Sequence, residues 1–264
     1  VMNSTGISNF GTAETIILTD NPSVTTLNSI LAKTTAPVTG TVIASMSDLN
    51  ALTETGNNLN ISVTGTYTTA ELTALNAKTI GPVTVSGTST ITGTLSEVEA
   101  VIAAGGITDI AKMNVTVTGG SITVAKLNSL LGTISAGTIT ASITETDTET
   151  LDDISRKGNY QISIAKTSAA GVTPVVESVD ATKVTDIAAL TNNVLTVTSS
   201  KITGAQDKVK AALLLNTPAA GTPVTATGLS TIKADISGTP TPTQLKDILA
   251  LTSGVVKSTP DALS

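Results

Sequence analysis

The sequence contains no cysteine, no histidine and no tryptophan, and it has one phenylalanine, two tyrosines and one arginine, Arg156. Without cysteine there is no disulfide, no thiolate metal site and no thiol nucleophile. Without histidine the chain lacks the commonest general base and the commonest transition-metal ligand. A single arginine cannot form the clusters that grip phosphate groups or read bases.

Charge is also scarce. Charged residues make up 13% of the 264 residues, against roughly 25% in average soluble domains. The net charge of −6 argues against nucleic acid and anionic membranes as partners. No run of 18 apolar residues occurs, so we expect no membrane insertion. We also expect that the chain is not an enzyme.

Threonine is the abundant residue, with 52 copies. Because large aromatic rings are nearly absent, the apolar volume must come from Val, Ile, Leu and Ala, which suit a thin, layered interior. A threonine-rich, cysteine-free chain of low charge is typical of secreted bacterial proteins, so we expect an extracellular or cell-surface location. The chain starts at Val1 without a signal-peptide pattern, and we expect a mature product or an excerpt of a longer array.

An apolar pattern recurs along the chain, with apolar residues at positions i, i+3 and often i+4, as in Leu27, Ile30 and Leu31. This spacing places the side chains on one stripe of a helix. The stripes begin at Leu27, Leu49, Leu72, Val98, Leu127, Leu151, Val184, Val209 and Leu245. Most intervals are 22–26 residues, which is within the range of solenoid repeats.

Helix-start signals precede these stripes. Thr68 with Glu71, and Ser96 with Glu99, have the spacing of a capping box. Hydroxyl groups also stand at expected N-cap positions in Ser47, Thr123, Thr148 and Thr243.

Alternating strand patterns follow the helices, as in residues 60–64, where Ile61 and Val63 alternate with polar residues. Gly65, Gly87, Gly119 and Gly228 follow such strands and predict tight corners. Second apolar segments are marked by Ile91, Ile122, Ile143 and Ile202. We predict that Val63, Val85, Val117 and Val197 point into one continuous core, with Thr64, Ser86, Thr118 and Thr198 outside.

The predicted fold is a right-handed α/β solenoid with a parallel β-sheet along one side and short helices along another, at about 22–26 residues per coil. It forms one continuous domain of about nine coils over residues 1–264, with insertions near 166–179 and 216–242. The alternative is a pure β-solenoid in which the apolar stripes are distorted strands.

Two repeats carry a resemblance. LNALTETGNNLNISVTG from Leu49 and ELTALNAKTIGPVTVSG from Glu71 resemble the repeat arrays of very large secreted bacterial surface proteins of the cyanobacterial type. The resemblance implies an adhesin, surface-layer or filament component. Such proteins often carry calcium-binding glycine-rich nonapeptides, and this chain has none.

One acidic segment is the only metal candidate: Glu145, Asp147, Glu149, Asp152 and Asp153. Carboxylate oxygens suit calcium. The alternative is a solvated turn before a helix, where acids favour the helix N-terminus. No other cofactor is expected. A glycosidase-like role for Asp152 and Asp153 would need a groove with aromatic platforms, and the chain has few aromatic residues.

Outward strand positions predict a binding face made of Thr64, Thr84, Thr116, Thr118, Thr138, Thr140, Thr196 and Thr198. A flat array of paired threonines resembles the face of ice-binding solenoids. The alternative is that threonine is simply a soluble strand residue.

The sequence thus predicts an extracellular structural protein, a self-assembling module of a surface filament, sheath, surface layer or giant adhesin. The expected partner is a second copy, head-to-tail or lateral, and a glycan or cell surface is a further candidate. Residues 15–18 and 254–257 have strand patterns that would leave sheet edges open for such a partner. The alternative function is a ligand-binding solenoid whose threonine-rich face binds ice or glycan.

Overall fold

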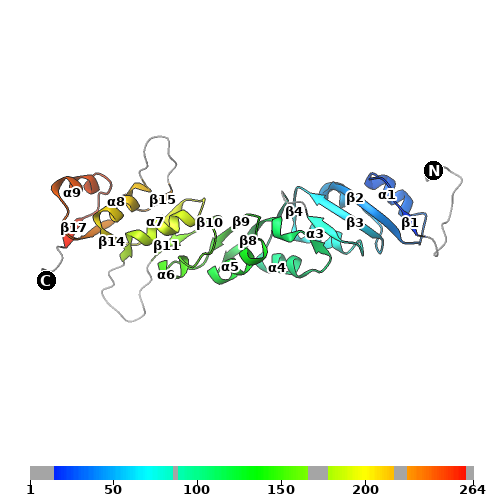
Figure 1. The fold of residues 1–264 in the computed structure, drawn as a ribbon, viewed down its shortest axis with the longest axis horizontal. Helices are drawn as coiled ribbons and strands as arrows, with labels where there is room; N and C mark the ends of the chain where they lie inside the picture. The colour runs from blue at the N-terminus through cyan, green and yellow to red at the C-terminus, as the bar shows by residue number, and fades with distance from the viewer. Residues whose placement is uncertain (1–14, 86–88, 166–177, 217–224, 260–264) are drawn as a thin grey trace. The chain divides into compact units, whose positions relative to one another are not determined.

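The computed structural model describes residues 15–85, 89–165, 178–216 and 225–259, and Figure 1 shows its helices and strands. The chain divides into two compact units. Unit 1 comprises Val1–Gly120 and Gly132–Ile139, and unit 2 comprises Ser121–Leu131 and Thr140–Ser264. In both units short helices alternate with short parallel strands, as the sequence patterns predict.

Unit 1 is built around two parallel sheets. Its helices are α1 (Val24–Leu31), α2 (Met46–Leu49), α3 (Thr69–Asn76), α4 (Leu95–Ala103) and the 3-10 helix η1 (Ile110–Lys112). Its strands are β1 (Ile16–Ile17), β2 (Val38–Ser45), β3 (Asn58–Thr64), β4 (Thr66–Thr68), β5 (Val83–Val85), β6 (Thr90–Gly93), β7 (Ile107–Thr108) and β8 (Asn114–Ile122). One sheet has the order β1-β2-β3-β5-β7, and in the other β6 lies between β4 and β8.

The remaining elements belong mainly to unit 2. The helices are α5 (Val124–Thr133), α6 (Thr148–Leu151), α7 (Ala181–Leu190), α8 (Gln206–Leu214) and α9 (Pro242–Leu249). The strands are β9 (Ile139–Ile143), β10 (Asn159–Gln161), β11 (Ser163–Ile164), β12 (Ser178–Asp180), β13 (Leu195–Val197), β14 (Lys201–Ala205), β15 (Ala226–Thr227), β16 (Lys233–Ser237) and β17 (Val256–Thr259). Two sheets have the orders β11-β13-β15 and β12-β14-β16-β17, and β9 pairs with β10.

The α/β character is confirmed, because the apolar stripes form helices and every strand pairing is parallel. The pure β alternative therefore does not describe either unit. The prediction of a single sheet along one side is wrong, since the described strands form four sheets. Repeats split their strand in two: β3 ends at Thr64, Gly65 turns with φ +102°, and β4 starts at Thr66 in the other sheet.

The predicted core valines are all buried, but they do not line one continuous sheet. Val63 and Val85 are register partners on β3 and β5. Val117 lies on β8 in the second sheet of unit 1, and Val197 lies on β13 in unit 2. Period-two alternation predicts which face is buried, but it does not say which sheet a strand joins. Thr64, Thr118 and Thr198 are exposed as predicted, and Ser86 lies outside the described residues.

The predicted insertions have different outcomes. Residues 166–177 lie outside the described residues, while 178–180 form β12, which pairs with β14. Residues 217–224 also lie outside them, but the rest of the second segment contains regular structure. There β15 pairs with β13, and β16 pairs with β14 over five residues. These two strands are members of the sheets.

Several helices start earlier than predicted. The capping box of Thr68 and Glu71 is confirmed, and the Thr123 hydroxyl accepts from Lys126 N at 3.2 Å. The other N-caps are Ser45, Thr94 with Glu97, Asp147 and Thr241 with Gln244, one or two residues before the predicted ones. In two of these repeats the strand runs directly into the helix, since β2 ends at the cap Ser45 and β6 ends one residue before the cap Thr94.

A buried threonine follows the helix in three repeats. The Thr79 hydroxyl donates to Leu59 O at 2.7 Å and accepts from Leu59 N at 3.0 Å and Gly81 N at 3.1 Å. Thr252 donates to Ile232 O at 2.7 Å and accepts from Gly254 N. Thr191 donates to Tyr160 O at 2.6 Å. In each case the hydroxyl joins a helix-to-strand corner to the preceding repeat, and we call these residues the corner threonines.

A glycine two residues after the corner threonine allows the close approach in two of these repeats. A Cβ at Gly81 would lie 2.3 Å from Leu59 O, and a Cβ at Gly254 would lie 2.1 Å from Ile232 O. No side chain fits at such distances, so glycine is required where the backbone of one repeat rests on the carbonyl of the previous one.

Asparagine side chains make a second repeated link. Asn28 on α1 donates to Ala51 O at 2.7 Å and accepts from Thr53 N at 3.1 Å. Asn128 on α5 makes the same pair of bonds to Asp153 O and Ser155 N. Each amide therefore satisfies one donor and one acceptor in the chain that follows the next short helix. We call these pairs the asparagine clamps.

The corner threonine gives a direct test of this packing. Thr79→Val keeps the side-chain shape but leaves Leu59 N and Gly81 N without their hydroxyl acceptor. We expect a loss of about 2 kcal/mol in the free energy of unfolding, because buried polar groups lose their partner. Urea unfolding measures it. The control is Thr41→Val at an exposed position of β2, where the change is expected to stay within about 0.5 kcal/mol. Equal effects at the two positions would contradict the role of the hydroxyl.

Candidate functional site

The acidic segment surrounds the start of α6, and the carboxylates of Glu145, Asp147 and Asp152 each accept a hydrogen bond. Asp147 is the N-cap of α6, and its Oδ1 accepts from Thr150 N at 2.8 Å. This backbone hydrogen bond holds the pKa of Asp147 below its ordinary value. Glu145 Oε2 accepts from Val124 N at 3.0 Å, at the start of α5.

Asp152 is engaged by a lysine. Its carboxylate accepts a hydrogen bond from Lys183 Nζ on α7. That hydrogen bond, with Coulombic attraction from Asp152, Asp186 and Glu149, raises the pKa of Lys183. Asp153 is exposed, and only its backbone carbonyl takes part, as acceptor for the Asn128 clamp. The acidic residues of this segment therefore serve the start of a helix, as an N-cap and as ion-pair partners.

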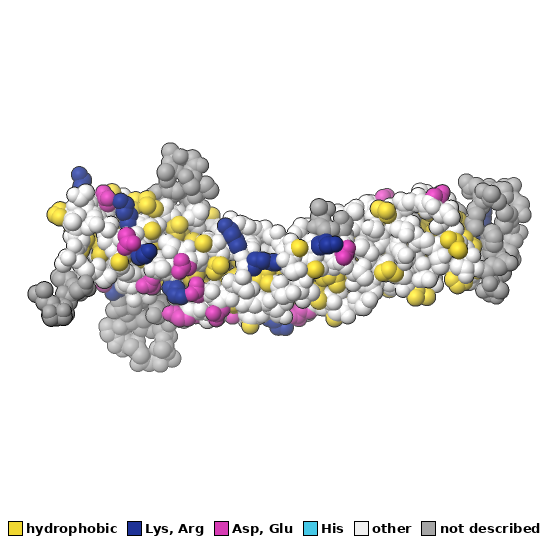
Figure 2. Space-filling view, in the orientation of Figure 1, with side chains coloured by type: hydrophobic (Ala, Val, Ile, Leu, Met, Phe, Trp, Pro, Cys, Tyr) yellow, Lys and Arg dark blue, Asp and Glu magenta, His cyan; other side chains and the backbone are white. Residues whose placement is uncertain are grey.

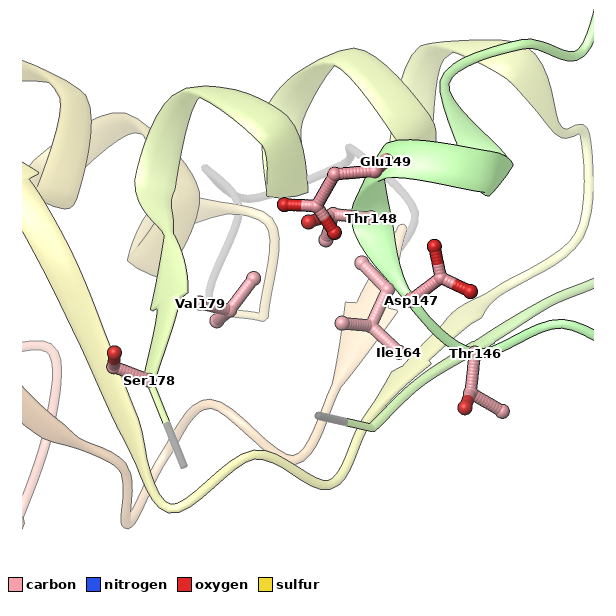
Figure 3. A pocket seen from close by; sticks show the side chains of 7 residues that line it. All are labelled: Thr146, Asp147, Thr148, Glu149, Ile164, Ser178 and Val179. Carbon is pink, nitrogen blue, oxygen red and sulfur yellow. The ribbon is translucent and has the colours of Figure 1, made fainter. Parts of the chain in front are cut away.

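The predicted calcium ligands are not gathered around one point. Figure 3 shows the carboxylates of Asp147 and Glu149 pointing in different directions from α6. Within the described residues no three acidic side chains form a group that could hold a metal ion. The hollow beside them, lined by Thr146, Asp147, Thr148, Glu149, Ile164, Ser178 and Val179, has a volume of about 10 Å³. That volume is room for a single water at most.

The predicted threonine face is divided among several sheets. Thr64 and Thr84 belong to β3 and β5, Thr116 and Thr118 to β8, and Thr196 to β13, while Thr198 follows β13. Thr140 lies on β9 beside Asn159, and Thr138 precedes that strand. The structure brings only some of these residues next to another threonine. Thr84 and Thr108 hydroxyls are 3.0 Å apart, Thr116 lies beside Thr92, and Thr196 lies beside Thr227.

A more regular array lies on β4, β6 and β8 of unit 1. Thr66, Thr90 and Asn114 are register partners, and so are Thr68, Thr92 and Thr116. We call these two sets the threonine rows. Members of a row are 24 residues apart in the sequence, and the residue between the rows on each strand, Tyr67, Ile91 or Val115, is buried. The sequence signal was the recurrence of Thr-x-Thr at 66–68, 90–92 and 138–140, with Asn114 in place of the first threonine at 114–116.

One sheet of unit 2 carries charged residues at its outward positions. In the sheet β12-β14-β16-β17, Lys201 is the register partner of Lys233, and Asp180 and Asp235 flank Thr203. Lys201 Nζ lies 2.6 Å from Asp235 Oδ2. Figure 2 shows charged side chains gathered over unit 2, whereas the surface over α1, β2 and β3 is mostly uncharged.

Comparison of the chain with protein-family models, with curated proteins and with solved structures finds no match. None of the described helices is long and apolar enough to cross a membrane. Any functional argument therefore depends on the residues themselves.

The capping role of Asp147 predicts a pH-dependent effect. Asp147→Ala removes an N-cap, and we expect a loss of about 1 kcal/mol in the free energy of unfolding at neutral pH. The folded-state pKa of Asp147 is lowered, so its contribution is present above the ordinary aspartate pKa and disappears as the pH falls through the folded-state value. Urea unfolding at neutral and at acidic pH measures the difference. Asp153→Ala, at an exposed carboxylate, is the control, and a loss for Asp147→Ala that does not change with pH would contradict this account.

The dispersed carboxylates predict weak calcium dependence. We expect the thermal unfolding midpoint of the chain to be the same with excess chelator and with millimolar-range calcium, because a ligand that binds only the folded state would raise it. Differential scanning calorimetry of the same preparation under both conditions provides the measurement. A clear fall of the midpoint in chelator would show that calcium does bind and stabilise the fold.

Proposed function

We propose that this chain is an extracellular structural protein, a self-assembling module of a surface filament, sheath, surface layer or adhesin, built as a right-handed α/β solenoid. The observation that carries the proposal is that polar side chains are used to join one repeat to the next or to cap a helix. The corner threonines, the asparagine clamps and the carboxylate caps are all committed to backbone partners.

The solenoid winding is supported by the pairing of the strands. Ile61 is the partner of Val83, and Val83 is the partner of Ile107, with α3 and α4 in the intervening chain. Parallel strands joined through a helix almost always form right-handed crossovers. Repeats that contact their neighbours through the same kind of corner form a one-dimensional stack.

Self-association is supported by sheet edges. Within the described residues β1 and β17 each pair with one strand, β2 and β16. In β1, Ile16 N donates to Pro37 O and Leu18 N donates to Thr39 O, so the Ile17 N–H points away from β2. An edge with free backbone donors is a template for a further strand. The partner that fits is an edge strand of a second copy, and repetition of such an edge-to-edge contact produces a fibre.

A non-enzymatic role is supported by the small volume of the hollow beside the acidic segment, about 10 Å³ among the described residues, and by the missing histidine and cysteine. Glycan binding finds little support, because Tyr67 and Tyr160 are both buried and offer no exposed ring for a sugar to stack on. An extracellular location agrees with the cysteine-free, threonine-rich composition.

The edge contact can be tested with two substitutions at one position. Ile17 is 71% exposed, so both Ile17→Ala and Ile17→Pro remove the same side chain at small cost to the fold. Only proline also removes the outward N–H. We expect concentration-dependent assembly of the parent chain and of Ile17→Ala, and a lower assembly state for Ile17→Pro. Sedimentation velocity and negative-stain electron microscopy give the measurement. A parent chain that stays monomeric at every concentration would overturn the proposal, and equal loss in both variants would show that the edge N–H is not the contact.

A further inference from the structure

We propose that two copies of the chain join through the apolar side of α9, each copy offering the same surface to the other. The surface consists of Leu245 and Leu249, which are four residues apart on one helix and therefore lie on the same side of it. We call these two residues the α9 face. The inference rests on the proposed function, since it names the surface and the symmetry of one contact in the assembly.

The α9 face is exposed where the equivalent positions of the other helices are buried. Leu245 is the fourth residue after the N-cap Thr241, and it is only half-buried. In the other eight α-helices of the described chain the residue at that position is 0% exposed, and these residues are Leu27, Leu49, Leu72, Val98, Leu127, Leu151, Val184 and Val209.

The second residue of the face shows the same difference. Leu249 is 57% exposed, whereas Leu213, its counterpart eight residues after the N-cap of α8, is 0% exposed. The position of these leucines within the helix is the same, so the difference must come from the neighbours of the helix. α9 is the last described helix along the chain, as Figure 1 shows.

The contacts of α8 show what covers such a face. α7 packs against α8, and α8 packs against α9. The pairing of Lys210 Nζ on α8 with Asp247 Oδ2 on α9, at 2.7 Å, holds the two helices together. The apolar side of α8 is thus covered by the next repeat, whose helix has an apolar stripe of its own. A surface that covers α9 in the same way is a further helix with an uncovered apolar stripe.

α9 of a second copy is the helix that meets this requirement. The helices α1 to α8 of the described chain already bury their stripe residues within their own copy, so they have none to offer to another chain. A surface that meets the same surface of a second copy forms an isologous contact with two-fold symmetry. In that contact Leu245 and Leu249 of each copy are removed from water by those of the other, which is favourable because both side chains are apolar.

The strand that follows α9 offers a second part of the same contact. β17 is the edge strand of the sheet β12-β14-β16-β17. Ala234 N donates to Val255 O at 2.9 Å, so the backbone groups of Val256, one residue further on, point away from β16. Two such edges related by a two-fold axis run antiparallel, and antiparallel strands pair readily.

The first test removes the apolar face by substitution. Leu249 is the last residue of α9, where a lysine side chain is favourable to the helix C-terminus, so Leu249→Lys is expected to fold. The matched control is Ile80→Lys in unit 1, at a side chain that is 77% exposed. Circular dichroism and the unfolding midpoint establish that each variant is folded, and Leu249→Ala serves if Leu249→Lys does not fold.

Sedimentation velocity is measured in the Ile17→Pro chain, so that the β1 edge does not contribute. We expect this chain and its Ile80→Lys form to be dimers. Adding Leu249→Lys is expected to weaken the dimer by more than about tenfold, because two charged groups would lose water in an apolar contact. A monomeric Ile17→Pro chain, or equal weakening by both lysine substitutions, would overturn the inference.

The second test determines the symmetry of the contact. The sequence contains no cysteine, so Leu249→Cys and the control Ile80→Cys each carry a single thiol. A bismaleimide with a reach of about 10 Å, one helix diameter, is expected to convert Leu249→Cys into covalent dimers and to leave Ile80→Cys largely monomeric. Weakened association in Leu249→Lys without cross-linked dimers of Leu249→Cys would show that a different surface covers α9, and would overturn the two-fold contact.

The outcomes separate this inference from the proposed function. A parent chain that assembles, with Leu249→Lys assembling equally well and no cross-linked dimer, would overturn the α9 contact and leave the structural role in place. A parent chain that stays monomeric at every concentration would overturn both.

Discussion

The fold depends on one hydrogen-bonding arrangement, the hydroxyl of a corner threonine on the backbone of the preceding repeat. At a helix-to-strand corner the main-chain amides and carbonyls have no partner in the helix or in the sheet. Burying such groups without a hydrogen bond costs free energy. Thr79 satisfies two amides and one carbonyl there, and Thr252 reproduces the bond to a carbonyl and the bond to the glycine two residues on. The strands on either side are short, so the corner bonds add to the few ladder hydrogen bonds that hold them.

The consequence is a molecule whose contacts run between neighbouring repeats. Corner threonines, glycines with a close carbonyl and asparagine clamps all link chain positions about 20 to 31 residues apart. Among the described residues these links join one repeat to the next, and no cluster of aromatic rings does so. This is why an interior of Val, Ile and Leu with two buried tyrosines is sufficient.

Much of this architecture could be predicted from the sequence, and the reason is local. Helical stripes such as that of Leu27, Ile30 and Leu31, and alternating segments such as residues 60–64, report burial through backbone periodicity, and both are confirmed. The number of sheets could not be predicted, because a turn at Gly65 moves the following strand to a different sheet without changing the alternation.

The candidate sites were harder to predict than the fold. Proximity in sequence suggested that the five acids from Glu145 to Asp153 share a ligand. In the structure Asp147 instead caps its own helix, and Asp152 accepts a hydrogen bond from Lys183. The threonine face depends on which strands become neighbours, so Thr116 was identified without its partner Thr92. The corner threonines do have a sequence pattern: a threonine after the helix is followed two residues later by glycine or asparagine. The pattern occurs at Thr79, Thr191 and Thr252.

The asparagine clamps are electrically neutral, and this has a consequence for the surroundings in which the protein keeps its shape. Dissolved salt screens the attraction between exposed charges over a distance of a few ångströms to about a nanometre. The Lys183–Asp152 and Lys210–Asp247 ion pairs therefore weaken as the salt concentration rises. An amide that donates to Ala51 O and accepts from Thr53 N has no net charge to screen. The links made by Asn28 and Asn128 are therefore expected to lose little strength as the salt concentration rises.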